Sequence, residues 1–435
     1  MIRFLYNLLF PIGLLFFLPA YLLKMRRRGN YRRNFAQRFG IYSPDVAARL
    51  ARPSATWIHA VSVGEVAIAL KLAAKMHQLD PAFRCVLTTT TTTGYAVAER
   101  DAPEWLQVLY NPLDFLPVVR RAFSVIRPTR IILVEAEIWP NLAAEARRRA
   151  IPLALVNARL SPRSERRFRR FRALVAPTFR CLDLVCVQET ADIDRWQALG
   201  VDRARIRHVG SIKYDPVEVA PTSTAPTEFL ERLGLPSDAP ILFGGSTHAG
   251  EERILAEALV QLRGESPSLA LIIAPRHVER VAAIRQILEQ LGLVVAQRTE
   301  TAMPGARPVD CLLLDSTGEL RDWYAAATVV FIGKSLTANG GQNPVEAILA
   351  GKPVIFGAHM ENFAVLASAL VAERGAVQVR DAAGLQTAAA ELLRQPADRA
   401  GLVANAQRVI DTHRGATART AELLLHLAST STPRA

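Results

Sequence analysis

Two series of short apolar runs, separated by longer segments of helical period, constrain the fold of this chain more than any other feature. Such alternation is typical of parallel α/β architecture, because parallel strands need a crossover helix between them. The runs are 56–62, 84–90, 130–136, 152–158 and 184–188 in the first series, and 241–247, 269–275, 311–316, 328–334, 353–358 and 376–380 in the second. The sequence therefore predicts an α/β protein with two Rossmann-like halves.

The length of the chain also favours two large domains. Its 435 residues are too many for one ordinary hydrophobic core, and 50% of them are hydrophobic. A stretch rich in proline, serine and threonine lies between the two series and suits an interdomain linker. We expect a membrane anchor over residues 1–24 and an N-terminal domain over 25–215. A linker over 216–236, a C-terminal domain over 237–428 and a frayed tail over 429–435 complete the chain.

The stretch Phe4–Leu23 contains no charged residue and is long enough for a helix to cross a bilayer core. Basic residues cluster after it, so the positive-inside rule places the following domains in the cytoplasm. A cleaved signal peptide is the alternative, but its positive charge should precede the apolar run. We expect a single uncleaved anchor, with Pro11 and Pro19 leaving open a kinked helix that dips into one leaflet.

A formal net charge of +13 implies an anionic partner, which is nucleic acid, a membrane surface or a phosphorylated substrate. Residues 163–172 carry six arginines, with Phe168 and Phe171 between them. Arginine runs are most often solvated helix faces, and contact with anionic lipid is the less common interpretation. The anchor favours the second interpretation, so we expect the anionic inner-membrane surface and not nucleic acid as the partner.

The string GGQNPVE over residues 340–346 joins a glycine pair, a polar turn, a proline and a carboxylate. Glycines let a backbone approach a phosphate, and Pro344 fits the first turn of a helix. Glu346 would then lie within reach of ribose hydroxyls. The string indicates a nucleotide-sugar site, although an ordinary helix start after a glycine loop fits it equally well.

Acidic residues follow two strands of the first series, where the functional loops of an open α/β sheet lie. Glu65 begins a helix whose dipole favours the ionised carboxylate, so it is either a general base or an ordinary first-turn acid. Glu135 and Glu137 share one face and should have an Arg or Lys nearby. Lys213 either reaches a phosphate or carboxylate of the substrate or is a surface lysine.

Polar residues also follow strands of the second series, around the proposed nucleotide site. They are Ser246, His248, Pro275, Arg276, Thr317 and Glu319. Arg276 can hold a phosphate with two donors, whereas His248 and His277 are more often scaffold residues at such positions.

Metal and nucleotide motifs of other kinds are absent, including GxxxxGK[ST] and HExxH. Asp192 and Asp194 lie two apart in an expected helix, where they face different directions and make a poor metal pair. Sugar transfer without a metal ion or other cofactor therefore fits the sequence better than metal-dependent transfer.

Eight ordered motifs carry a family resemblance, namely WIHAVSVGE, TTTTTTG, VEAEIWPNL, NARLSPRS, GSIKYD, GGSTHAGEE, APRHVER and GGQNPVEA, the last followed by HMENF. Over nearly its whole length the chain resembles the 3-deoxy-D-manno-octulosonic acid (Kdo) transferases of lipid A assembly. The resemblance implies inverting glycosyltransferases of the GT-B fold, with two Rossmann-like domains facing across a cleft and an N-terminal membrane anchor helix.

The resemblance also implies roles for single residues. Glu65 matches the catalytic base, and Glu135 and Lys213 match residues that support the transition state. The CMP-binding segments match Pro275, Arg276, Thr317, Gly318, Glu319, Asn343, Pro344, Val345 and Glu346. Gln37, Gln342 and Ala347 stand where relatives usually have Glu, His and Pro, and no role is assigned to them.

By this resemblance the chain transfers Kdo from CMP-Kdo to the lipid A precursor (lipid IVA) at the cytoplasmic face of the inner membrane, a step of lipopolysaccharide biosynthesis. One alternative is another GT-B nucleotide-sugar enzyme, either a UDP-sugar transferase or an epimerase. The other alternative is a catalytically inactive, membrane-anchored binding protein.

Overall fold

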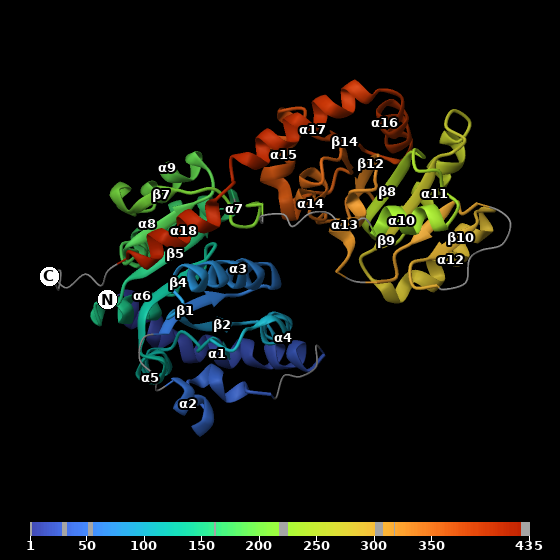
Figure 1. Cartoon of the computed structure of the whole chain (residues 1–435). Coiled ribbons are helices and arrows are strands. Elements are labelled where there is room, and N and C mark those ends of the chain that lie inside the picture. Colours follow the sequence, from blue (N-terminus) through green and yellow to red (C-terminus); the bar gives the residue numbers. More distant parts are fainter. Residues whose placement is uncertain are drawn as a thin grey trace. The chain divides into compact units, whose positions relative to one another are not determined.

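The computed structural model describes residues 2–27, 33–50, 55–160, 162–216, 225–300, 308–316 and 318–427. The chain divides into two compact units, of which the first is Met1–Asp215 with His413–Ala435 and the second is Pro216–Thr412. Each unit contains one sheet of seven strands with helices around it (Figure 1). The predicted α/β class is confirmed.

The first sheet has the strand order β3-β2-β1-β4-β5-β6-β7, and all neighbouring strands are parallel. Its strands are β1 Ala55–Ala60, β2 Arg84–Thr89, β3 Leu106–Tyr110, β4 Pro128–Val134, β5 Leu153–Ala158, β6 Leu184–Val187 and β7 Ile206–His208. The direction of the strand order changes between β1 and β4. This position is the topological switch point, where open α/β sheets bind their ligands.

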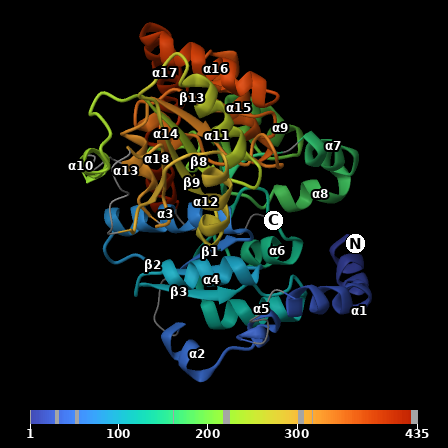
Figure 2. The ribbon, with the colours of Figure 1, turned by 90° about the vertical axis from the view of Figure 1, so that its right-hand side faces the viewer.

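Helices cover both faces of the first sheet (Figures 1 and 2). They are α1 Ile2–Arg27, η1 Phe35–Phe39, α2 Pro44–Leu50, α3 Val63–Leu79, α4 Thr92–Asp101, α5 Leu116–Ile126, α6 Pro140–Arg148, α7 Pro162–Arg170, α8 Arg172–Phe179, α9 Thr190–Ala198, η2 Arg203–Arg205 and α18 Ala416–Leu425. Trp57 packs with Phe123 of α5 on one face, and Ile58 packs with Leu72 of α3 on the other. Burial of both faces explains why the strands are nearly continuous apolar runs.

Helix α18 belongs to the first unit although it lies near the end of the chain. It packs beside α3, and its Leu424 joins the same core as Leu72 (Figure 1). The Asp215 carboxylate accepts hydrogen bonds from the N–H groups of Gly415 and Thr417, each at 2.7 Å. The sequence interpretation instead assigned residues up to 428 to the second domain, because no local pattern shows this long-range packing.

The second sheet has the order β10-β11-β9-β8-β12-β13-β14, and its direction changes between β8 and β12. Its strands are β8 Ile241–Thr247, β9 Ala270–Pro275, β10 Val295–Gln297, β11 Cys311–Leu313, β12 Val329–Ile332, β13 Val354–Phe356 and β14 Val377–Gln378. Its helices are α10 Ala225–Arg232, α11 Glu251–Leu262, η3 Val278–Arg280, α12 Val281–Gln290, α13 Leu320–Tyr324, α14 Val345–Leu349, η4 Glu361–Phe363, α15 Ala364–Ala372, α16 Ala382–Arg394 and α17 Pro396–Asp411. Helix α10 occupies part of the stretch 216–236 that was predicted as linker.

The membrane-spanning anchor predicted over residues 1–24 is not found. Within the part of the chain that the structure describes, no helix is both long and apolar enough to cross a bilayer. Helix α1 contacts the rest of the first unit, since Asn7 donates a hydrogen bond to the Asn141 side chain at 2.8 Å. The Phe10 and Phe115 rings stack with their centroids 5.7 Å apart. Part of α1 therefore packs against protein.

Candidate active site

The predicted site residues lie beyond the carboxyl ends of strands in both units. In the first unit the loops after β1 and β4 carry the acidic residues, on the two strands that flank the switch point. In the second unit the loops after β8, β9, β11 and β12 carry the polar residues. Each unit thus collects its predicted residues along one edge of its own sheet.

The start of α3 fixes the position of Glu65. Ser62 is the N-cap residue, and its hydroxyl accepts the Glu65 N–H at 3.3 Å and donates to the Glu65 Oε1 at 2.8 Å. The Val61 N–H donates to the Glu65 Oε2 at 2.9 Å. This pattern resembles a capping box in which the carboxylate accepts the N–H before the N-cap residue, and it holds the carboxylate in one orientation at the helix start.

Three carboxylates interact at this edge of the first sheet. Burial raises the pKa of Glu65, hydrogen bonds from Val61 and Ser62 oppose the rise, and the nearby Glu135 adds to it. Burial likewise raises the pKa of Glu137, and the nearby Glu65 and Glu135 carboxylates raise it further. The predicted tendency of the helix start to keep Glu65 ionised is therefore outweighed by burial, and the carboxylate is a stronger base than an exposed one.

Two cations accompany these acids, as the sequence predicted for Glu135. The Arg159 Nε lies 3.7 Å from the Glu135 Oε2. Burial and the nearby Arg159 together lower the pKa of Lys213 to about 8, and Glu135 opposes them. The structure thus brings Glu65, Glu135 and Lys213 into one electrostatic cluster. Arg159 was not predicted as a site residue, although it stands in the motif NARLSPRS.

The backbone is strained at the same sheet edges. Glu135, Asn157, Ser246 and Lys334 all have positive φ angles, between 51° and 63°. They lie at the carboxyl ends of β4, β5, β8 and β12, respectively. Such angles are unfavourable for residues other than glycine and tend to persist at functional sites, where the surrounding structure enforces them. No sequence pattern indicated this strain.

In the second unit the buried Glu251 joins the loops on both sides of the switch point. Its Oε2 accepts the N–H groups of His248 and Lys334, each at 2.8 Å. Its Oε1 accepts the N–H groups of Ser335 and Leu336 at 3.0 and 3.1 Å. One carboxylate therefore fixes the loop after β8 to the loop after β12. The sequence analysis gave Glu251 no role.

The glycine pair of the string GGQNPVE is required by neighbouring protein. Gly340 and Gly341 have φ angles of 118° and 69°, which side chains disfavour. A Cβ atom on Gly340 would lie 2.7 Å from the Asn362 Nδ2, and one on Gly341 would lie 2.5 Å from the Met360 Sδ. The Gly340 N–H donates to the Glu361 carboxylate at 2.6 Å. This amide, expected to face a phosphate, already has a protein acceptor.

The rest of that string forms the start of α14. Pro344 immediately precedes the helix, and the Asn343 side chain accepts the Val345 N–H at 3.2 Å. Burial raises the pKa of Glu346, and Arg321 opposes the rise. Glu346 is thus a partly buried carboxylate in the first turn, as predicted.

The other residues expected to bind CMP follow β9 and β11. Pro275 ends β9, and the Arg276 N–H donates to the Thr247 carbonyl at 3.1 Å while its side chain is exposed. Gly318 has a φ angle of 93°, which favours glycine. Thr317 lies outside the described residues.

Glu319 has two donors within the second unit. Its Oε2 accepts hydrogen bonds from the Arg298 Nε and the Trp323 Nε1, each at 3.2 Å. Burial would raise the pKa of Glu319, but these donors hold it below its ordinary value. The carboxylate is therefore fixed and ionised beside Gly318.

Known proteins resemble this chain in sequence and in fold. Residues 33–216 match the family model of 3-deoxy-D-manno-octulosonic-acid transferase (kdotransferase). The chain is 31% identical over 395 residues to the 3-deoxy-D-manno-octulosonic acid transferase of Haemophilus influenzae. The aligned region covers 91% of each of the two chains. The chain is 34% identical over 414 residues to the 3-deoxy-D-manno-octulosonic acid transferase of Bordetella pertussis. The aligned region covers 92% of this chain and 94% of the relative.

Solved structures add a likeness of fold. The UDP-GlcNAc 2-epimerase from Neisseria meningitidis bound to UDP-GlcNAc matches with a TM-score of 0.57 and 11% identity, over 86% of this chain and 99% of that chain. At this identity the likeness concerns the fold alone.

Proposed function

The chain belongs to the family of 3-deoxy-D-manno-octulosonic acid (Kdo) transferases, and on that premise we propose that it transfers Kdo from CMP-Kdo to a lipid A precursor in lipopolysaccharide biosynthesis. The observation that carries the proposal is the cluster of Glu65, Glu135 and Lys213 at the switch point of the first sheet. A base with a cation in the same electrostatic cluster is what an inverting sugar transfer needs.

Glu65 is the general base of this reaction. It takes the proton from an acceptor hydroxyl while the hydroxyl oxygen attacks the anomeric carbon of Kdo, and CMP leaves from the opposite face. One displacement therefore inverts the anomeric centre. The hydrogen bonds from Val61 and Ser62 hold the carboxylate in place, and its raised pKa improves it as a base. A carboxylate with two bonds retains lone pairs for the substrate proton.

Lys213 and Glu135 support the charges that change in the reaction. Lys213 carries a positive charge below a pH of about 8 and balances the phosphate or carboxylate of the donor. Glu135 offsets the repulsion between Lys213 and Arg159, because it lies 3.7 Å from the Arg159 guanidinium.

The second unit binds the CMP portion of the donor. The exposed Arg276 side chain holds the phosphate with two donors, and Glu346 accepts hydrogen bonds from the ribose hydroxyls. The remaining contacts come from Pro275, Thr317, Gly318, Glu319, Asn343, Pro344 and Val345. No resident metal ion or cofactor is part of this proposal.

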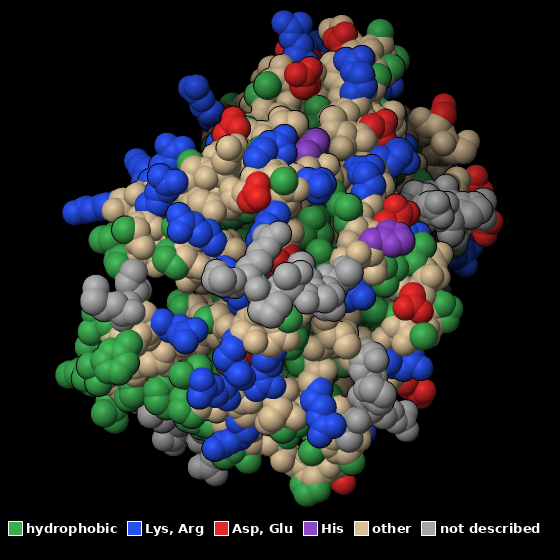
Figure 3. All heavy atoms as spheres, turned by 90° about the vertical axis from the view of Figure 1, so that its left-hand side faces the viewer, with side chains coloured by type: hydrophobic (Ala, Val, Ile, Leu, Met, Phe, Trp, Pro, Cys, Tyr) green, Lys and Arg blue, Asp and Glu red, His purple; other side chains and the backbone are tan. Residues whose placement is uncertain are grey.

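Helix α1 attaches the protein to the cytoplasmic surface of the inner membrane, lying in the interface. Its outward face is apolar and exposed at Phe4, Leu5, Leu8, Leu9, Ile12, Leu15 and Phe16. On the face drawn in Figure 3, hydrophobic side chains gather at the lower left, and Lys and Arg side chains lie near them. An apolar helix face beside basic residues is the pattern that binds anionic bilayers.

The direct test is to incubate the purified protein with freshly made CMP-Kdo and a tetraacylated lipid A precursor, and to weigh the lipid product by mass spectrometry. The proposal expects product heavier by whole Kdo units, with CMP but not UDP as a competitive inhibitor. Absence of product with a folded, CMP-binding protein would refute it. Inhibition by UDP alone would favour a UDP-sugar enzyme instead.

A further inference from the structure

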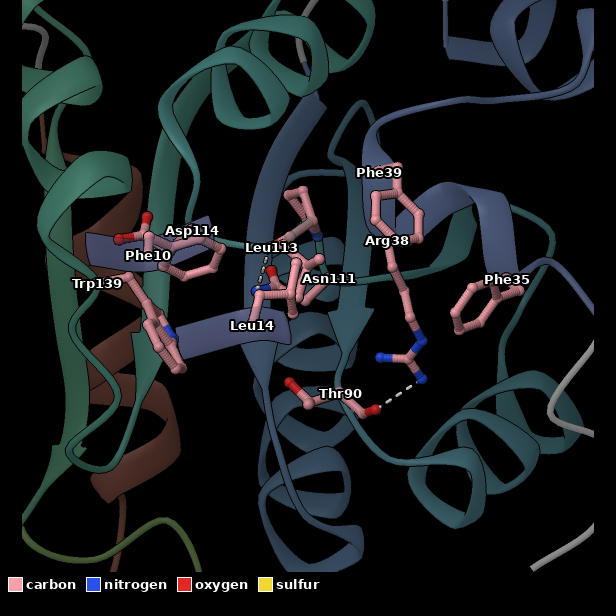
Figure 4. A pocket seen from close by; sticks show the side chains of 11 residues that line it. Phe10, Leu14, Phe35, Arg38, Phe39, Thr90, Asn111, Leu113, Asp114 and Trp139 are labelled. Carbon is pink, nitrogen blue, oxygen red and sulfur yellow. Dashed lines mark hydrogen bonds between the residues drawn. The ribbon is translucent and has the colours of Figure 1, made fainter. Parts of the chain in front are cut away.

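The first unit contains an apolar pocket of about 270 Å³ between α1 and η1. Phe10 and Leu14 of α1 face it from one side, Phe39 of η1 from another, and Trp139 closes a third (Figure 4). The loop 111–114 after β3 forms its floor. Aromatic and aliphatic side chains of this kind favour an apolar ligand.

The pocket adjoins the carboxylate cluster through one loop. Thr90, which lines the pocket, lies between Thr89 and Thr91, whose hydroxyls donate to the Val61 carbonyl at 3.3 and 3.1 Å. The Val61 N–H in turn donates to the Glu65 carboxylate. The pocket and the proposed base therefore share one edge of one sheet.

A buried guanidinium gives the pocket a polar end. Arg38 is 3% exposed, and its Nη2 donates to the Thr90 carbonyl at 2.8 Å (Figure 4). Its Cζ lies 4.1 Å from the centre of the Tyr110 ring. The Gln37 side chain accepts the Tyr110 N–H at 2.9 Å and so fixes η1 beside β3. The guanidinium marks one polar end of an otherwise mostly apolar lining, and such a lining suits a ligand with an apolar tail and a polar end.

The helix that lines the pocket is also apolar on its exposed side. Phe10 and Leu14, four residues apart, line the pocket, while Leu15 and Phe16 on other faces of α1 are 72% and 79% exposed. If the exposed side of this helix lies in the membrane interface, the pocket on its other side is near acyl chains, which expose less apolar surface to water when they enter it.

We propose that this pocket binds one acyl chain of the lipid acceptor, with Arg38 facing the polar end of that chain. The inference rests on the proposed function, because it requires an acylated acceptor whose sugar reaches Glu65. Binding of the tail orients the sugar toward the carboxylate. The pocket thus selects acylated acceptors over sugars of the same structure without acyl chains.

The test compares Leu14→Trp, which fills the pocket, with Leu79→Trp, which changes an exposed leucine of α3 in the same unit. Both are assayed in detergent micelles with the tetraacylated precursor and with its fully deacylated form. Leu14→Trp should raise the KM for the acylated acceptor by about tenfold, as expected when the burial of roughly two methylene groups is lost. The KM for CMP-Kdo and the weak transfer to the deacylated acceptor should not change.

The outcomes separate the two proposals. No transfer to either acceptor by the unmodified protein would refute the function. Transfer with the same acylated-acceptor KM in both variants would refute the pocket and leave the function standing. Should Leu14→Trp fail to fold, an acceptor carrying a diazirine on one acyl chain is cross-linked to the unmodified protein. Label on peptides containing Phe39 or Trp139 supports the inference, and label confined to residues 15 and 16 overturns it.

Discussion

The two units use acidic side chains at equivalent sheet edges in opposite ways. In the first unit Glu65, Glu135 and Glu137 interact with one another, and burial raises the pKa of two of them. In the second unit Glu251 and Glu361 accept backbone N–H groups and hold loops together. The first arrangement suits proton transfer, and the second suits a preorganised binding surface.

Backbone conformation does not explain why the acidic side chains of the two units act differently. Both edges have two residues other than glycine with positive φ angles, Glu135 and Asn157 in the first unit and Ser246 and Lys334 in the second. In both sheets, the residues with positive φ angles lie at the ends of strands at or near the switch point. The fold therefore supplies the same strained loop ends twice, and the side chains decide whether an edge reacts or binds.

Removing the proposed base should produce the largest effect. Glu65→Gln keeps an oxygen for the Val61 N–H but cannot take a proton, so kcat should fall by about 10²- to 10⁴-fold. Single-turnover release of CMP from CMP-Kdo measures the loss. Binding of CMP, measured by calorimetry, should remain unchanged, since the second unit supplies the nucleotide site. Turnover within a few-fold of the unmodified rate would remove Glu65 from the mechanism.

Glu251 should matter for stability where Glu65 matters for rate. Glu251→Gln turns an amide N–H toward backbone donors in a fully buried site, so the second unit should lose about 3 kcal/mol of its free energy of unfolding. Urea denaturation followed by circular dichroism measures this loss. Glu257→Gln on the exposed side of α11 is the matched control and should change little. Equal midpoints for the two variants would show that Glu251 does not hold the loops.

Most of both sheets could be predicted from sequence, because strands buried on both faces are continuous apolar runs. The strands that were missed are β3, β7 and β10, and each lies at an edge of its sheet. An edge strand pairs on one side only and needs fewer apolar residues, as in β7, whereas β3 was missed although four of its five residues are buried. In β7 only the first of three residues is buried.

The site was predictable where residues follow a strand in sequence and unpredictable where they meet across the chain. Glu135 directly follows β4, and Glu65 lies in the first turn of the helix that follows β1. The bonds of Glu251 to residues 334–336 instead join positions 83 to 85 apart. The partners of Gly340 and Gly341 likewise come from residues 360–362. Long-range contacts of this kind leave no periodic signal.

The charge of Lys213 should set the alkaline limit of activity. Burial and Arg159 lower its pKa to about 8, so Lys213 loses its proton, and the donor its countercharge, as the pH rises through that value. The ratio kcat/KM should therefore decline above about pH 8 in the unmodified protein. Lys213→Arg keeps its charge at high pH and should shift the decline upward. An unchanged alkaline limb in this variant would assign the titration to another group.

Removing charge from α7 should have the smallest effect and should act on the acceptor alone. Arg163→Gln with Arg166→Gln should raise the acceptor KM by about fivefold on anionic vesicles, because exposed charges contribute less than ~1 kcal/mol each. Arg380→Gln with Arg394→Gln in the second unit removes the same net charge and is the control. The difference between the two pairs should vanish in high salt, since the screening length shortens. An equal rise in both pairs would mean that net charge, and not the face of α7 in the first unit, attracts the acceptor.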